Sequence, residues 1–213
     1  MRLWRLLLRA TTRLFSHGDP WEKFEYEVPN AMFGHGSLHD FRWYFGGDSA
    51  VQVQSVDHIC EWLIACEYAS DSALFHEPDY WQHPRTFEEL RKGDCEDHAL
   101  WAWRKLVELG HDTHLMIGKW TPPGGQPGDH AWVTFEKDGV GYILEGVRKR
   151  RETMILRLDD VRAHYEPMFS VDHNFTRYAY TGYLKHVHAL LLGRGKPRRV
   201  PERSGPIVVP RGE

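Results

Sequence analysis

The sequence predicts an α+β fold in which helices of the first half pack on a mostly antiparallel sheet formed by the second half. Two helical patterns come first, over residues 55–69 and 95–109, and patterns typical of strands follow from residue 114 onward. Helices followed by a run of strands are typical of the α+β class, whereas regular alternation of the two would predict a parallel sheet. We expect the helix over 95–109 to lie against the sheet.

The segments before and between the two helices show less order. Residues 17–50 are rich in glycine, histidine and aromatic residues without a steady period, so we expect irregular chain with one short helix or strand. In the helix over 55–69, Ser55 can act as the N-cap. Two prolines predict a loop over 76–85, followed by a short helical turn over 86–90. Apolar residues at helical spacing support the first helix: Val56, Ile59, Cys60, Leu63 and Ile64.

The second helix is expected to begin at Cys95 and to stop at Gly110. Asp94 is a good N-cap residue, and Asp97, three positions on, can complete a capping box. Backbone N–H groups point outward at the start of a helix, and the positive end of its dipole favours a thiolate over a thiol. The sequence therefore places a lone thiol where a helix can activate it.

Strand patterns fill the rest of the chain as far as residue 183. We expect strands over 114–120, 129–136, 140–146, 153–158 and 174–183. The second and third of these flank a Lys-Asp-Gly sequence, which is a strong signal for a tight hairpin.

The hairpin register decides which side chains meet. If Asp138 and Gly139 are the two central residues of the turn, Trp132 lies opposite Glu145. His130 and Glu145 then share a face as diagonal neighbours, at a spacing that long side chains can bridge. A slip of one residue would turn Glu145 to the other face.

Cys95, His130 and Glu145 form a candidate triad. A thiol, an imidazole and a carboxylate can serve as nucleophile, general base and orienting group. The oxyanion of the intermediate would be held by the backbone N–H of Cys95 and by one further donor. The Trp81 indole and the Gln82 amide are both candidates for that donor, and the sequence does not choose between them.

Two alternatives remain open near the thiol. His98 lies one turn beyond Cys95 and competes for the role of base. Asp94, Glu96 and Asp97 could together hold Ca²⁺, which prefers several oxygen ligands, although Asp94 and Asp97 also suit helix capping alone. The thiol mechanism itself requires no cofactor.

These motifs resemble the transglutaminase-like cysteine peptidase superfamily, particularly its bacterial members. The resemblance spans roughly residues 56–146, and it implies a papain-like core whose cysteine helix packs on an antiparallel sheet that carries the histidine and the acid. The family usually has aspartate as the third residue, where this chain has Glu145, one methylene longer. The resemblance is carried by Tyr68, Asp71, Trp81, Pro84, the Gly93-Asp94-Cys95-Glu96-Asp97 run, His130-Ala131-Trp132 and Glu145.

The resemblance implies thiol chemistry on amide carbonyls in a bacterial or phage protein. We expect a cysteine-dependent hydrolase that acts on amide bonds of proteins or peptides through a thioester intermediate. One alternative is a transglutaminase-type acyltransferase, in which an amine resolves the same thioester. The other is an inactive or metal-binding interaction module of the same fold.

Charge and cysteine content support the remaining expectations, which concern domain organisation, binding partners and cellular location. The 213 residues carry a net charge of −3, but both ends are basic. We expect a basic amphipathic arm over 1–16, one catalytic domain over 17–192 and a disordered basic tail over 193–213. The basic ends could contact a membrane surface or an acidic partner, and no specific binding of nucleic acid is expected. Three cysteines are too few for a disulfide scaffold, which favours a reducing, cytoplasmic location.

Overall fold

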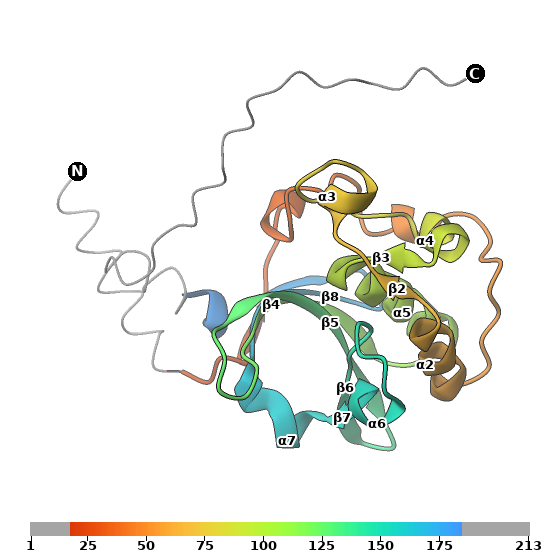
Figure 1. Cartoon of the computed structure of the whole chain (residues 1–213). Helices are drawn as coiled ribbons and strands as arrows, with labels where there is room; N and C mark the ends of the chain where they lie inside the picture. The colour runs from red at the N-terminus through yellow and green to blue at the C-terminus, as the bar shows by residue number, and fades with distance from the viewer. Residues whose placement is uncertain (1–17, 185–213) are drawn as a thin grey trace, which may run out of the picture.

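An antiparallel sheet in the order β1-β9-β8-β4-β5-β6-β7 forms the centre of the molecule, with helices α2, α3, α4 and α5 gathered on one side of it (Figure 1). This computed structural model describes residues 18–184. Helix α5 packs against β4 and β5, which confirms the predicted α+β class and the position of the cysteine helix. The expected arm over 1–16 and the tail over 193–213 lie outside the described residues.

The elements have the following bounds. The sheet contains β1 (Lys23–Glu25), β4 (Thr113–Trp120), β5 (Gly128–Lys137), β6 (Val140–Leu144), β7 (Ile155–Arg157), β8 (Tyr165–Asp172) and β9 (Arg177–Tyr180). A separate parallel pair consists of β2 (Glu67–Tyr68) and β3 (Lys92–Gly93). The α-helices are α2 (Val56–Ile64), α3 (Asp71–Leu74), α4 (Pro84–Leu90), α5 (Cys95–Glu108), α6 (Arg151–Met154) and α7 (Leu158–Val161). Three 3₁₀ turns are η1 (Asn30–Met32), η2 (Trp43–Phe45) and η3 (Arg162–His164). Among residues 18–184, none of the helices is long and apolar enough to span a membrane.

The β5–β6 hairpin has the predicted register. Asp138 and Gly139 have φ values of 54° and 72°, the left-handed conformation that a two-residue type I′ turn requires. Strand pairing runs from Lys137 opposite Val140 to Val133 opposite Leu144. The next pair in this register is Trp132 and Glu145, so Glu145 lies on the expected face.

Strand β8 lies in the middle of the sheet, between β9 and β4, but the sequence analysis did not predict it. It contains Pro167, which cannot donate a ladder hydrogen bond and so argues against a central strand. The sheet accommodates this proline opposite Gly118, where the β4–β8 register shifts at a bulge. Gly118 is required there, because a Cβ atom would come within 2.2 Å of the Glu166 carbonyl oxygen.

Other predicted boundaries differ from the observed ones. The strand expected over 153–158 is split into α6 and the short β7, and the last strand covers only Arg177–Tyr180. Helix α2 ends at Ile64 because the chain enters β2 soon afterwards, whereas α4 begins earlier than expected, at Pro84. Proline suits the first position of a helix, so this loop ends at residue 83.

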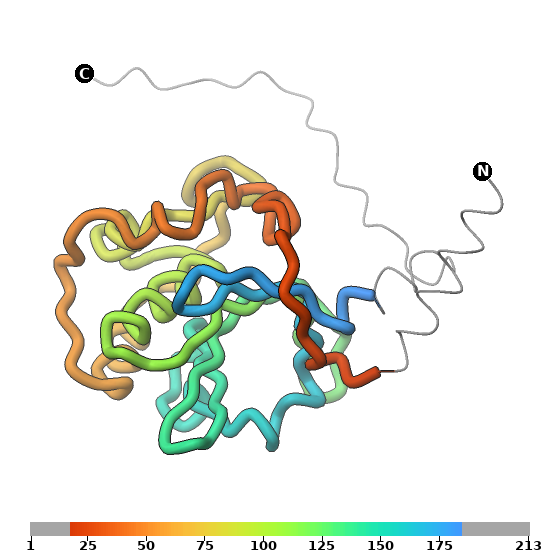
Figure 2. Tube along the Cα trace, turned by 180° about the vertical axis from the view of Figure 1, so that it is seen from behind, coloured from red at the N-terminus to blue at the C-terminus, as the bar shows by residue number. Residues whose placement is uncertain are grey.

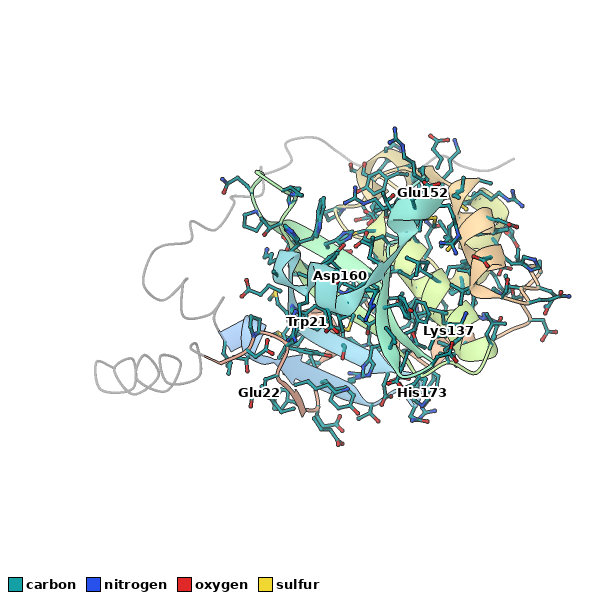
Figure 3. The ribbon with its side chains drawn as sticks, turned by 90° about the horizontal axis from the view of Figure 1, so that it is seen from below. Trp21, Glu22, Lys137, Glu152, Asp160 and His173 are labelled. Atoms are coloured by element: carbon teal, nitrogen blue, oxygen red, sulfur yellow. The ribbon has the colours of Figure 1, made fainter. Side chains whose placement is uncertain are left out.

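The N-terminal chain lies along the edge of the sheet as β1, paired with β9, before it joins the helical side, as Figure 2 shows from behind. Trp21 lies on the face of the sheet away from α5, where α7 also packs and Asp160 is labelled (Figure 3). Its indole N–H reaches the carbonyl oxygen of Tyr165 at 3.1 Å, and its ring meets that of Trp132 edge-on. This segment therefore helps to cover the aromatic cluster behind the candidate site.

A fully buried lysine ties α5 to the chain before α2. Lys105 is 0% exposed and its ammonium lies 3.5 Å from a Glu88 carboxylate oxygen and 2.7 Å from the Val51 carbonyl oxygen. Glu88 in turn accepts from the Trp101 indole at 2.9 Å and from the Ala50 N–H at 2.8 Å. A buried charge of this kind is tolerated only while its partners stay in place.

Candidate active site

Cys95 begins helix α5, as the capping pattern predicts. The Asp94 N–H donates to the Asp97 carboxylate at 3.4 Å, which is the contact of a capping box. The thiol is partly exposed, and its sulfur lies 3.4 Å from Glu96 Oε2. Cys60 and Cys66 are buried instead, and burial raises the pKa of each thiol to about 11. Of the three cysteines, Cys95 is therefore the one placed for chemistry.

His130 and Glu145 are paired across the β5–β6 hairpin. His130 Nε2 lies 3.1 Å from Glu145 Oε1 and 3.0 Å from Oε2, and Glu145 is only 1% exposed. Because a carboxylate accepts, Nε2 carries the proton of this contact and Nδ1 is the nitrogen left for a thiol. The longer side chain of Glu145 therefore reaches the imidazole with both oxygens.

The pKa of His130 depends on its contact with Cys95. Burial lowers the pKa of His130, but hydrogen bonds with the Cys95 thiol and the Glu145 carboxylate outweigh it and raise the pKa to about 10. A pKa raised in this way favours the imidazolium form at neutral pH. The fold thus brings together the three side chains that the sequence analysis singled out as a triad.

Tyr165 is a further member of this group that the sequence analysis missed. Its hydroxyl donates to Glu145 Oε1 at 2.7 Å from strand β8, which was not recognised as a strand. Burial and the neighbouring Glu145 charge both raise the pKa of Tyr165, so the hydroxyl keeps its proton and remains a donor. Glu145 is thus held from two sides, by an imidazole and by a phenol.

Replacing Tyr165 with phenylalanine is expected to lower kcat by about 10-fold with little change in KM. A hydrogen bond to a charged group is typically worth about 1.5–3 kcal/mol, and its loss leaves Glu145 free to rotate away from His130. Steady-state kinetics on a peptide substrate would measure this. Tyr180→Phe, which removes a buried hydroxyl bonded to Ser170, is the matched control and should leave kcat unchanged.

Aromatic rings surround the imidazole. The ring of Trp132 stacks on His130 with centroids 6.0 Å apart, and the Trp120 ring lies 5.8 Å away. The Arg148 guanidinium lies 4.8 Å from the Trp120 centroid. Among these rings the His130 side chain is only 11% exposed, and low exposure strengthens its contact with Glu145.

His98, the alternative base, is engaged elsewhere. It is 0% exposed, and burial lowers its pKa to about 4. Its Nδ1 lies 2.7 Å from the Asp94 carbonyl oxygen and its Nε2 lies 3.2 Å from Lys149 Nζ. Because both ring nitrogens have partners, the geometry favours His130 as the base.

The two oxyanion candidates differ. The Gln82 amide nitrogen donates to the Lys92 carbonyl oxygen at 2.9 Å and to Asp97 Oδ2 at 2.5 Å, which occupies both of its hydrogens. In this structure the Gln82 amide is engaged with Asp97 and Lys92, and its role as an oxyanion donor stays a prediction. Trp81 is buried with its indole nitrogen beside Gly34, and its role stays a prediction.

Five carboxylates gather beside the nucleophile, and they include the three expected residues together with Asp71 and Asp79. Ligand oxygens of Asp71, Asp94 and Asp97 lie within 4.8 Å of one another, as do those of Asp71, Asp79 and Glu96. Asp94 and Glu96 form a third such group with the Cys95 sulfur, so the predicted set of Asp94, Glu96 and Asp97 is part of a larger cluster that Asp71 and Asp79 join. Asp71 belongs to the motif that carries the family resemblance, but its sequence context does not mark it as a ligand.

The carboxylate cluster has the chemistry of a site for a hard cation. Asp71 is 2% exposed, and its Oδ1 has no hydrogen-bond partner among residues 18–184. Burial raises the pKa of Asp71 to about 6, and it raises those of Glu96 and Asp97 well above their usual values. An orphaned buried oxygen among crowded carboxylates fits Ca²⁺, which binds through several oxygens.

No protein-family model matches the chain, and no curated protein does. Among solved structures, the chain is similar to Legionella pneumophila LapG in a calcium-bound form, in an EGTA-treated form and in a third structure, each with 16% identity and a TM-score of 0.42. The match covers 76% of this chain, and it covers 82% of the calcium-bound LapG chain and 80% of the other two. Because identity and TM-score are both low, the likeness assigns no activity, ligand or site residue to this chain.

Proposed function

We propose that the protein is a cysteine-dependent hydrolase that acts on amide bonds of proteins or peptides. The observation that carries this proposal is the chain of contacts from the Cys95 thiol through His130 to Glu145. A buried carboxylate that holds one nitrogen of a histidine, while a thiol uses the other, is the arrangement needed to activate sulfur.

In the proposed reaction, the thiol proton of Cys95 resides on His130, and the thiolate attacks the carbonyl carbon to form a C–S bond. The imidazolium of His130 gives its proton to the leaving amine as the C–N bond breaks, which leaves a thioester. His130 then takes a proton from water, whose oxygen attacks the thioester carbonyl carbon. The C–S bond breaks, the carboxylic acid leaves, and Cys95 is restored as the thiolate beside the His130 imidazolium. Glu145 keeps the imidazole in one orientation through both steps. The Cys95 backbone N–H at the start of α5 supports the oxyanion.

Substitutions of Glu145 test its part in this mechanism. Glu145→Gln should lower kcat by about 10³-fold or more, because the amide would present N–H towards His130 Nε2 and disfavour the required tautomer. Glu145→Asp keeps the charge and should cost only about 10-fold. The measurement is kcat on one peptide substrate for the two variants. Equal losses in both would remove Glu145 from the mechanism.

We further propose that the carboxylate cluster binds Ca²⁺ through Asp71, Asp94 and Asp97, with Asp79 and Glu96 beside them. The cation would supply positive charge that offsets the repulsion among the buried carboxylates beside the nucleophile. The support for this site is the unpartnered Asp71 Oδ1 and the raised pKa values of the cluster.

Calcium at about 100 times its Kd should stabilise the fold by about 2.7 kcal/mol. For a chain of this size this raises Tm by roughly 5–10 °C. Thermal unfolding with and without calcium measures the shift, which should vanish in Asp71→Asn. Asp159→Asn changes an exposed acid on α7 and is the control that should keep the shift. An unchanged Tm of the wild-type protein would contradict the site.

A further inference from the structure

His98 is a buried histidine beside the nucleophile for which the proposed reaction has no use. Its ring packs edge-on against Phe87, with centroids 4.8 Å apart. Each ring nitrogen has a different partner, Nδ1 the carbonyl oxygen of Asp94 and Nε2 the ammonium of Lys149. Because both ring nitrogens are hydrogen-bonded, His98 connects the segment that contains Asp94 with the segment that contains Lys149.

The two partners determine the tautomer of His98. A carbonyl oxygen can only accept, so Nδ1 must carry the hydrogen of the 2.7 Å contact with Asp94. An ammonium can only donate, so Nε2 must accept from Lys149 through its lone pair. His98 is therefore a neutral imidazole with its hydrogen on Nδ1, and each of its two polar atoms is used once.

One partner lies beside Cys95 and the other lies close to Glu145 in the sequence. Asp94 caps α5 directly before Cys95, whereas Lys149 lies in the loop that follows Glu145. The loop also touches the helix directly, because a Cβ atom on Gly146 would come within 2.9 Å of His98 Cβ. His98 therefore links helix α5 to this loop through hydrogen bonds at a point where the two backbones lie close together.

Lys149 also anchors the bridge to a third element. Although Lys149 is an exposed residue, its ammonium turns inward and donates to the Leu63 carbonyl oxygen at 2.8 Å. Leu63 lies in the last turn of α2, where a cation interacts favourably with the carbonyl end of the helix dipole. The ammonium therefore has a fixed position from which to hold His98.

We propose that His98 and Lys149 are positioning residues that hold the turn carrying Cys95 at a fixed distance from the loop carrying Glu145. This inference rests on the proposed function, because the distance matters only if sulfur, imidazole and carboxylate act together. Neither residue has a catalytic role in it. A misplacement of about 1 Å between such groups can cost on the order of 10²-fold in rate.

The test measures how fast iodoacetamide alkylates Cys95 in the full chain at one fixed pH. Lys149→Met removes one end of the link and should lower the rate about 5-fold or more. His98→Asn keeps a donor to the Asp94 carbonyl but cannot reach Lys149, so it should give a similar loss. The double variant should be no slower than either single variant, since residues that act through one contact are not additive. Arg150→Met removes an exposed charge from the same loop and is the matched control, with an expected change below about 2-fold.

A second readout does not depend on the chemistry of Cys95. ¹⁵N NMR of the imidazole should show His98 in the wild-type protein as the neutral Nδ1–H tautomer, with loss of this signature in Lys149→Met. An Nε2–H signature, or equal alkylation rates in Lys149→Met and Arg150→Met, would overturn the link. If the tautomer is as expected but His130→Ala alkylates as fast as the wild type, the proposed function fails instead, and the positioning role fails with it.

Discussion

Cys95→Ala is expected to reduce turnover of a peptide substrate to background, a loss on the order of 10⁴-fold or more. The sulfur is the atom that forms the thioester, and in the proposed mechanism no other side chain can replace it. Cys95 is partly exposed at a helix start, so the smaller side chain leaves no large cavity and the fold should remain intact. Kinetics together with circular dichroism would measure both effects.

The matched control for this variant is Cys66→Ala. Cys66 is buried near the end of α2, and its raised pKa makes it an inert thiol. It should therefore retain full turnover at some cost in stability. Activity that survives in Cys95→Ala, or that disappears equally in both variants, would show that Cys95 is not the nucleophile.

Lys105→Met is expected to give the largest loss of stability, about 3–5 kcal/mol. The substitution leaves the carboxylate of Glu88 buried without its cation, and it removes one of the two donors to the Val51 carbonyl oxygen. Urea denaturation would measure the change in the free energy of unfolding. The double variant Lys105→Met with Glu88→Gln removes the uncompensated charge and should recover at least half of the loss, and a double variant as unstable as the single one would contradict this explanation.

The same network predicts a dependence of stability on pH. Burial alone would raise the pKa of Glu88, but hydrogen bonds from Ser49, Trp101 and Ala50 and the charge of Lys105 outweigh it and lower the pKa. A carboxyl group whose pKa is lowered by folding contributes stability above its unfolded value, about 4.3, and loses it as the pH falls through the folded value. The difference between wild type and Lys105→Met should therefore shrink in acid.

Local sequence signals predicted the features that depend on neighbouring residues. The capping residues around Cys95 located the start of α5, and Gly110, with a φ of 82°, follows its end. The Asp138-Gly139 turn set the hairpin register, and with it the face shared by His130 and Glu145. Such signals act over a few residues, so one sequence is enough to interpret them.

The features that the sequence could not predict depend on contacts between distant segments. Strand β8 was missed because its proline is tolerated only through the bulge that Gly118 allows on the neighbouring strand. The partnership of Tyr165 with Glu145 was missed for the same reason. Asp71 joins the carboxylate cluster from α3, more than 20 residues before Asp94, and no local pattern marks it as a ligand.

The central claim is that His130, held by Glu145, activates the Cys95 thiol. Its most direct test is the rate at which iodoacetamide modifies the protein at about pH 6, where the raised pKa of His130 keeps the imidazole protonated. The raised pKa values of Cys60 and Cys66 keep those thiols silent at this pH, so the rate reports on Cys95. We expect rapid modification of the wild-type protein and a loss of about 100-fold in His130→Ala. A slow wild-type reaction that His130→Ala leaves unchanged would contradict the claim.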